Sequence, residues 1–341
     1  MPNRLAMLLA GCAVLLLVPQ ARAENPTSES SKSTTAPPSA GASNENRAPS
    51  DKAAEYQLVW SDEFNQDGRP DPKNWTYEHG FVRNHEAQWY QPENARCENG
   101  LLIIEARREK FKNPNYDASA NSQRWQRSRE YADYTSCSMT TRGLHEWTYG
   151  RFEMRGRIDT SAGLWPAWWT LGRGRWPAAG EIDIMEYYRG ILKANIAWAG
   201  EQNRGGATWN SAVRQISRFP ADWSSKFHIW RMDWDENDIK LYVDDMLLND
   251  QDLTKTIDND ARKTNPFVAA PQYMILNVAV GGDNGGDPSQ TTFPSKMEVD
   301  YVRVYQKHAA DRINHETGDK GTSQKNNGQK TDSPNSDDTK G

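Results

Sequence analysis

Cysteine and histidine are scarce in this sequence, and stripes of basic residues are missing from it. It holds three cysteines and six histidines in 341 residues. The histidines are scattered and show none of the spacings typical of a zinc site. The formal net charge is −5 and no basic stripe runs through the sequence, so nucleic acid is not an expected partner.

Further absences exclude other classes of protein. No Gly-x-Ser-x-Gly sequence is present, which excludes the nucleophile elbow of serine hydrolases. Gly172–Pro177 begins like a dinucleotide-binding fingerprint but lacks its third glycine. Beyond residue 18, no apolar run reaches the roughly 20 residues that a membrane-spanning helix needs. We therefore expect no cofactor in catalysis and no membrane span.

The first 23 residues have the pattern of a secretory signal peptide. An arginine at position 4 precedes a short apolar run, which ends at Ala21-Arg-Ala23. The alternative is lipidation, because Leu9-Ala-Gly-Cys12 resembles a lipobox. We expect a secreted or periplasmic protein, which would be anchored to a membrane only if Cys12 carries lipid.

Two polar segments flank the middle of the chain. Residues 24–55 are rich in Ser, Thr and Pro, and residues 307–341 in Asn, Asp, Lys and Gly. Neither can bury enough apolar surface to offset the entropy cost of ordering, so we expect both to be disordered. Residues 56–306 remain as one compact domain, which we expect to be monomeric.

The middle of the sequence predicts strands and few helices. Gly150–Ile158 alternates polar and apolar residues as a half-buried strand does. Other expected strands are 101–106, 227–234, 239–243, 273–280 and 299–305, with a hairpin turn at 235–238. Many short strands between turn residues are typical of a β-sandwich or a barrel. The polar segments 107–134 and 200–221 are expected to be loops that shape a cleft.

Tryptophan is unusually abundant, with fourteen in the chain. Many lie beside Gly, Pro and polar residues, outside apolar runs, although at least half should still belong to the core. A tryptophan half exposed in a groove offers a flat apolar face to a sugar ring. The composition therefore favours a carbohydrate-binding groove.

Three acids alternate with apolar residues in the segment Trp176–Tyr187. On a regular strand Glu181 and Asp183 share one face, while Glu186 points to the other. A β-bulge at Ile184-Met185 would turn Glu186 to the face of the other two. Buried acids are costly unless they face a wet cleft, so we predict this bulge. The alternative is an exposed edge strand with solvated acids.

A pair of carboxyls close together on one strand is suited to cleaving glycosidic bonds. Retaining glycosidases hold two carboxyls about 5–5.5 Å apart. We expect Glu181 to be the ionised nucleophile and Glu186 the acid/base, with its pKa raised by the charges of its neighbours. Asp183 lies between them and could hydrogen-bond Glu181.

The sequence Gly180-Glu-Ile-Asp-Ile-Met-Glu186 resembles the signature of glycoside hydrolase family 16, the laminarinase, lichenase and agarase group. Further matching blocks are 60–64, 84–90, 149–153, 163–169, 276–282 and 300–306. The resemblance implies an all-β jelly-roll sandwich of two antiparallel sheets with a concave substrate cleft. It also implies the roles given above for Glu181, Asp183 and Glu186.

The resemblance places several other residues in the cleft. It implies sugar contacts for Trp176 and Trp165, whereas at least one of Trp168 and Trp169 should pack beneath the sheet. Further candidates for substrate binding are Asn84, Glu86 and Trp89, for which ordinary turn chemistry is the alternative. Many laminarinase-like members carry His on the strand after the acids. Here Asn195 and Trp198 occupy that region, somewhat as in lichenases.

The resemblance also implies a structural calcium on the convex side, with Glu63, the Gly100 carbonyl and Asp300 as candidate ligands. Apart from the family, these acids look like unremarkable surface residues. Cys97 and Cys137 either form a disulfide or are two separate buried thiols.

We therefore expect a secreted retaining endo-hydrolase whose partner is a β-linked polysaccharide, with β-1,3- or mixed-linkage glucan first. The alternatives are a hydrolase of red-algal galactan (agar, porphyran, carrageenan), a transglycosylase, and a non-catalytic carbohydrate-binding sandwich.

Overall fold

The computed structural model describes residues 56–200, 206–259, 263–268 and 270–307. The expected signal peptide and linker, and the expected tail beyond Lys307, lie outside these residues. Within the described ranges, no helix is both long enough and apolar enough to cross a membrane.

Two antiparallel sheets make up the fold, which is a jelly-roll sandwich. The eight-stranded sheet has the order β17 (Met246–Asp252), β16 (Asp238–Val243), β15 (His228–Trp234), β10 (Gly150–Ile158), β19 (Ser295–Lys307), β5 (Leu101–Ala106) and β4 (Ala95–Glu98), and β1 (Tyr56–Asp62) also pairs with β19. The seven-stranded sheet has the order β14 (Thr208–Gln215), β13 (Ile191–Trp198), β12 (Glu181–Tyr188), β11 (Leu164–Gly172), β18 (Gln272–Val280), β9 (Ser138–Thr140) and β2 (Thr76–Tyr77).

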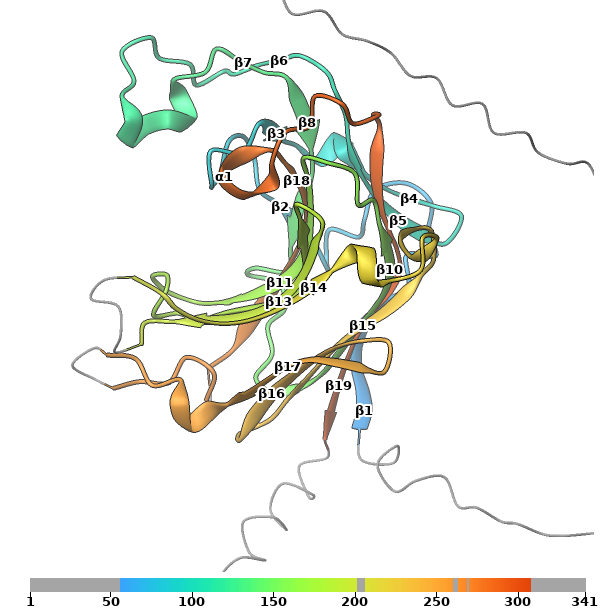
Figure 1. Ribbon diagram of the computed structural model, residues 1–341, viewed down its shortest axis with the longest axis vertical. Helices are drawn as coiled ribbons and strands as arrows, with labels where there is room; N and C mark the ends of the chain where they lie inside the picture. Colours follow the sequence, from blue (N-terminus) through green and yellow to red (C-terminus); the bar gives the residue numbers. More distant parts are fainter. Residues whose placement is uncertain (1–55, 201–205, 260–262, 269, 308–341) are drawn as a thin grey trace, which may run out of the picture. The chain divides into compact units, whose positions relative to one another are not determined.

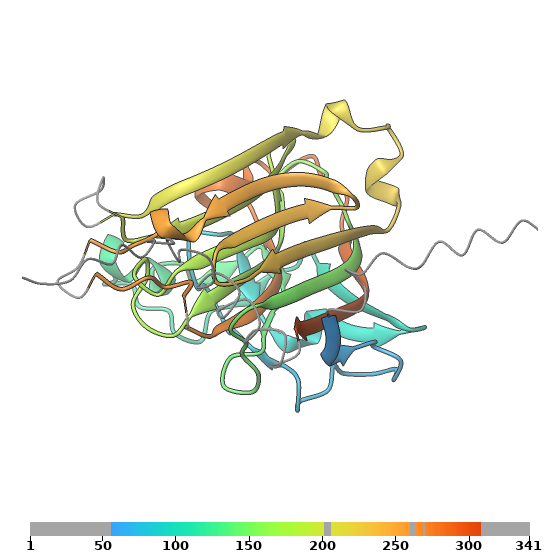
Figure 2. The same ribbon diagram turned by 90° about the horizontal axis from the view of Figure 1, so that it is seen from below.

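The figures show how the sheets are arranged. In Figure 1, β11, β13 and β14 curve together as one layer, and β15, β16 and β17 belong to the other. Figure 2 shows β15, β16 and β17 side by side next to the green β10, with the blue β1 against the red end of β19. Shorter elements are β3 (Gln88–Tyr90) with β8 (Tyr134–Ser136), β6 (Phe111–Lys112) with β7 (Tyr131–Ala132), and α1 (Gly282–Gly285).

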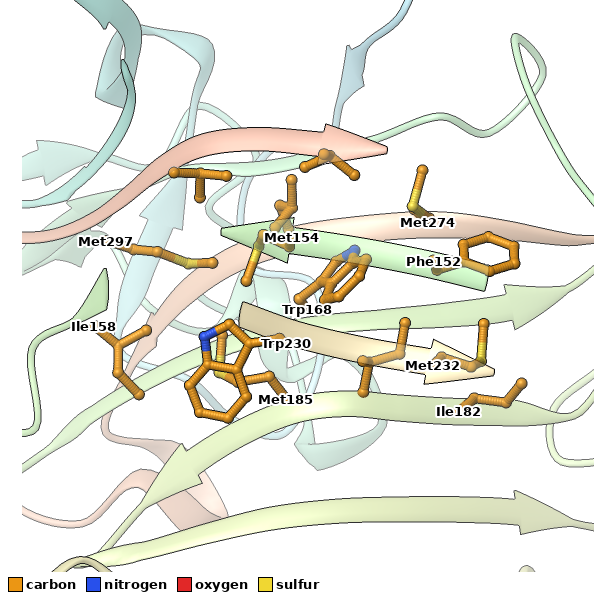
Figure 3. Close-up of a cluster of buried hydrophobic side chains, with 14 of the residues drawn as sticks. Phe152, Met154, Ile158, Trp168, Ile182, Met185, Trp230, Met232, Met274 and Met297 are labelled. Atoms are coloured by element: carbon orange, nitrogen blue, oxygen red, sulfur yellow. The ribbon is translucent and has the colours of Figure 1, made fainter. Parts of the chain in front are cut away.

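The core lies between the two sheets. Figure 3 shows side chains from both sheets meeting there, including Phe152 and Met154 of β10 and Trp168 and Met185 of the seven-stranded sheet. Strand β10 buries every second residue and leaves those between them partly exposed, as its sequence pattern predicts. Burial of this apolar surface is the dominant stabilising contribution to the fold.

Most of the predicted strands are confirmed, and their ends differ by a few residues. The predicted strand 299–305 is longer, because β19 begins at Ser295 and ends at Lys307. The prediction that 200–221 is a loop is wrong in part, because β14 occupies Thr208–Gln215. The residues of β14 alternate between partly buried and exposed, and none is fully buried. The segment therefore looks polar in sequence although its burial has the period of a strand. Segment 107–134 contains the short strands β6 and β7 and a 3₁₀ helix at Ser122–Arg127.

The two cysteines are free and buried, so of the two alternatives left open by the sequence, that of two separate thiols holds. Cys97 lies on β4 in one sheet, whereas the carbonyl of Cys137 accepts a hydrogen bond from Val278 of β18 in the other. Each thiol fills space in the core as a small apolar group. Burial raises the pKa of Cys97 to about 12, which keeps its thiol protonated.

Candidate active site

Strand β12 carries the predicted β-bulge. In its pairing with β13, Asp183 faces Asn195 and Glu186 faces Lys193, so β12 has one residue more than its partner. The pairing with β11 shifts at the same place. Ile184 and Met185 at the bulge are both buried in the core. The bulge therefore changes the alternation, and all three acids line one cleft on the outer face of the seven-stranded sheet.

Five strands, the helix α1 and two loops supply the cleft. Strand β11 contributes Trp165, Ala167, Trp169 and Leu171; β12 contributes the three acids and Tyr188; β13 contributes Lys193 and Asn195; β14 contributes Trp209 and Ser211. The loop before β3 adds Arg83, Asn84 and Glu86, β18 adds Asn277, α1 adds Asn284, and the loop before β12 adds Trp176. The alternation of each strand explains this set, since residues two apart on a strand share a face.

Each of the two glutamates accepts a hydrogen bond from a tryptophan. The Nε1–H of Trp176 donates to Oε2 of Glu181 at 2.8 Å, and the Nε1–H of Trp165 donates to Oε1 of Glu186 at 2.7 Å. These donors fix the carboxylates in place and favour their ionised forms. The two predicted cleft tryptophans are therefore both beside the acids.

Asn195 donates hydrogen bonds to two of the three acids. Its Nδ2 donates to Asp183 at 2.9 Å and to Glu186 at 3.0 Å. Its Oδ1 is buried without a partner among the described residues. Asn195 faces Asp183 across the two strands, so the register of β13 places it there.

The electrostatics of the cleft raise the pKa of all three acids. Burial, and then the charge of Glu186, raises the pKa of Glu181 to about 7, although hydrogen bonds from Trp176 and Asp183 oppose the increase. Burial, and then the charge of Asp183, raises the pKa of Glu186 to about 8. Burial also raises the pKa of Asp183 well above its usual value, and its hydrogen bond to Glu181 contributes. The sequence analysis predicted that neighbouring charge would raise the pKa of Glu186, whereas burial is the larger cause.

The loop before β3 brings two of its three predicted residues to the cleft. Asn84 and Glu86 line it, and Glu86 is 2% exposed, with its pKa raised by burial. The prediction for Trp89 is wrong, because its ring packs with Phe81 and Phe111 in a separate small cluster. Trp89 lies on a strand between buried Gln88 and Tyr90, where alternation gives no exposed face.

The prediction that Trp198 contacts substrate is also wrong. Trp198 lies in the main core, whereas Asn195 faces the cleft. The two residues are three apart on β13, so a regular strand directs them to opposite faces. Trp168 and Trp169 divide as expected, with Trp168 in the core and Trp169 in the cleft, where its Nε1–H donates to Asn277.

The two acidic candidates for calcium ligands are engaged with arginines. Arg303 donates to both oxygens of Glu63 at 2.9 and 2.7 Å, and Arg155 pairs with Asp300 at 2.6 Å. Among the described residues, no three His, Cys, Asp or Glu side chains gather as a metal site would require. Arranged this way, the residues do not fit a calcium site. The structural calcium stays a prediction of the resemblance.

Several cleft residues were missed by the sequence analysis. Arg83 lies over the ring of Trp169 at 5.0 Å and pairs with Glu78. Lys193 contacts Tyr188, and its charge acts on Glu186. Alternation along β13 and β14 could have identified Lys193, and Trp209 as well, because each is an even number of residues from another cleft residue. Arg83 belongs to a loop, for which no such period exists.

Comparisons with known proteins agree with this geometry. The model of Glycosyl hydrolases family 16 matches residues 87–303. A beta-glucanase of Rhodothermus marinus is 38% identical over 275 residues, covering 75% of this chain and 87% of the relative. The laminarinase catalytic domain of Thermotoga maritima has a TM-score of 0.61 at 34% identity, covering 74% of this chain and 99% of that chain.

A second solved structure is similar to the same degree. It was described with endo-acting O-glycanases that prominent members of the human gut microbiota express to initiate mucin breakdown. Its TM-score is 0.68 at 35% identity, with 76% of this chain and 93% of that chain covered. Since the family model matches well over half of the chain and glucanase relatives extend along the same domain, this protein belongs to glycosyl hydrolases family 16 and is an endo-β-glucanase-like glycosidase.

Proposed function

We propose that the protein is a secreted, retaining endo-hydrolase of β-1,3- or mixed-linkage glucan. The bulge of β12 carries the proposal, because it brings Glu181, Asp183 and Glu186 to one cleft wall beside two tryptophans. Glu181 and Glu186 are four regular strand positions apart once the bulge is allowed for, or about 13 Å between Cα atoms. Their side chains can extend toward one another to hold one sugar ring between them.

In the first step the Glu181 carboxylate attacks the anomeric carbon. Glu186 transfers its proton to the glycosidic oxygen as that bond breaks, and a covalent glycosyl-enzyme forms. The pKa of Glu186, about 8, is higher than that of Glu181, about 7, so Glu186 is the group that favours the protonated form at neutral pH. The hydrogen bond between Asp183 and Glu181 lowers the pKa of Glu181 and so favours the ionised nucleophile.

In the second step the Glu186 carboxylate takes a proton from water. The resulting hydroxide attacks the anomeric carbon, the bond to Glu181 breaks, and the two inversions together retain the β configuration. Trp165 and Asn195 hold Glu186 in place for both transfers. Hydrolysis rather than transglycosylation requires that water resolves the covalent intermediate.

Replacement of Glu181 tests the proposal. Glu181→Gln should abolish hydrolysis of laminarin and mixed-linkage glucan and keep the melting temperature close to the native value. Glu236→Gln is the matched control, because it makes the same change on an exposed hairpin. NMR of the first product should show the β anomer. An α product would exclude retention, and unchanged activity in Glu181→Gln would exclude this nucleophile.

The substrate is tested with a panel of glycans. Laminarin and mixed-linkage glucan should be cut fastest, with oligosaccharides as the main products. Agar, porphyran, carrageenan and a mucin O-glycan belong in the panel because β13 offers Asn195 where many laminarinase-like members carry His. Faster cleavage of a galactan or of mucin would overturn the glucan assignment and leave the chemistry intact. Binding without cleavage of any member would favour a non-catalytic role.

A further inference from the structure

Two tryptophans form an exposed aromatic surface at one end of the cleft. Trp209 of β14 and Trp176 of the loop before β12 are each 46% exposed. Their ring centroids are 6.4 Å apart and the planes are inclined by 49°. Trp176 also donates to Glu181, whereas no hydrogen bond of the Trp209 ring is recorded among the described residues. Such large apolar side chains exposed side by side in a groove are typical of a binding surface.

This surface is continuous with the acid strand. Glu181 of β12 faces Ala197 of β13, which in turn faces Trp209 of β14. Ala197 has only a methyl group and is fully buried, so its own side chain does not stand between the nucleophile and the tryptophan. Two residues along the same strands, Asn195 of β13 faces Ser211 of β14, and Ser211 is also small. Glu181, Ser211 and Trp209 line the same cleft, so a glycan chain that crosses the strands at Glu181 continues toward Trp209.

The distance between the strands limits which sugar can reach Trp209. Strand β14 stands two places from β12, or about 10 Å at the usual spacing of neighbouring strands. A ring at the cleaved bond contacts Glu181 and Trp176, and a ring farther along the chain is needed to reach Trp209. The position thus fits a subsite away from the cleaved bond.

Strand β14 is held rigidly although it lies at the sheet edge. All eight of its residues pair with β13. On its other face, Asn210 donates to Gln251 of β17 at 2.8 Å, and Asn249 donates to the carbonyl of Asn210 at 3.2 Å. The Trp209 ring is therefore presented from a fixed backbone, which reduces the entropy cost of binding.

We propose that Trp209, which adjoins Trp176, is a stacking site for a sugar ring of the substrate chain that lies beyond the cleaved bond. The occupant is a neutral β-linked glycan, whose ring offers a flat face of C–H groups to the indole and whose hydroxyls stay in water. This inference rests on the proposed function. It makes Trp209 a residue that favours long chains over short ones.

Kinetics on glucans of different length test the inference. In Trp209→Ala we expect the KM for laminarin to rise roughly tenfold, the loss of one good stacking contact, with a smaller change in kcat. The effect should decrease as the oligosaccharide becomes too short to reach β14, and Trp209→Phe should recover most of the affinity. Val213→Ala is the matched control, since Val213 lies on the same face of β14, is 50% exposed and is outside the cleft lining.

Binding to Glu181→Gln protein, measured by calorimetry with laminari-oligosaccharides, separates affinity from turnover. Trp209→Ala in this background should weaken the binding of long oligosaccharides roughly tenfold. If glucan is cut and bound but Trp209→Ala behaves as Val213→Ala does, or affects all chain lengths equally, only this inference is overturned. If the native protein neither cuts nor binds glucan, the proposed function and this inference both fail.

Discussion

Each active-site glutamate accepts a hydrogen bond from one indole N–H. Removal of that donor should shift one limb of the pH profile of kcat/KM and leave the other limb in place. In Trp165→Phe the carboxylate of Glu186 loses the donor at 2.7 Å. That hydrogen bond favours the ionised form, so its loss raises the pKa of Glu186 above about 8. Glu186 must be protonated to act as the acid, and the alkaline limb of kcat/KM should therefore shift to higher pH.

The size of the shift follows from the strength of the bond. A hydrogen bond to a charged group contributes about 1.5–3 kcal/mol, and a tenfold change in an acid dissociation constant corresponds to about 1.4 kcal/mol. We expect the alkaline limb to rise by about one pH unit, at the lower end of this range because water can partly replace the donor.

The corresponding change beside the nucleophile should shift the acid limb of the profile instead. Trp176→Phe removes the donor to Glu181 and raises its pKa above about 7. Because Glu181 must be ionised, the acid limb should then move to higher pH, and activity at pH 6 should fall more than activity at pH 8. Trp176 is more exposed than Trp165, so water should make this shift smaller.

The assay is the pH dependence of kcat/KM on a short soluble glucan oligosaccharide at constant ionic strength. Trp169→Phe is the control for ring truncation, because its N–H donates to Asn277 and to no acid; neither limb should move. The reasoning is refuted if Trp165→Phe moves the acid limb, or if both variants leave the limbs where the native protein has them.

Three other predictions concern the nucleophile's partner, the core and the thiols. Asp183→Ala removes a hydrogen bond to Glu181, so kcat/KM should fall about tenfold to a hundredfold, and a native rate would exclude Asp183 from the mechanism. Trp198→Ala creates a core cavity and should lower the free energy of unfolding in urea by about 3–5 kcal/mol, with a smaller loss in Trp198→Phe; a change below about 1 kcal/mol would contradict its place in the core. Because Cys97 and Cys137 are free, a reducing agent should leave the melting temperature unchanged, whereas the loss of a disulfide would cost about 2–5 kcal/mol and lower it clearly.

The acid strand could be predicted from sequence because its constraint is local. Three acids in an otherwise apolar strand are tolerated only on a wet face, and one extra residue is the simplest way to bring all of them there. The same alternation should have separated Asn195 from Trp198 and identified Trp209 on β14. The prediction for Trp198 came from the resemblance, and Trp209 was missed because its segment was assigned by polarity; in both cases the period was not followed.

What the sequence by itself determined is the class of fold, the strands that alternate clearly, and the bulge that brings Glu186 beside Asp183. Tertiary structure decided the remainder. Whether Cys97 and Cys137 bond, whether Glu63 faces a metal or Arg303, and which tryptophan donates to Glu186 all depend on residues far apart in the chain. Local periodicity fixes the face on which a side chain lies, whereas the packing of the sheets decides what that side chain meets there.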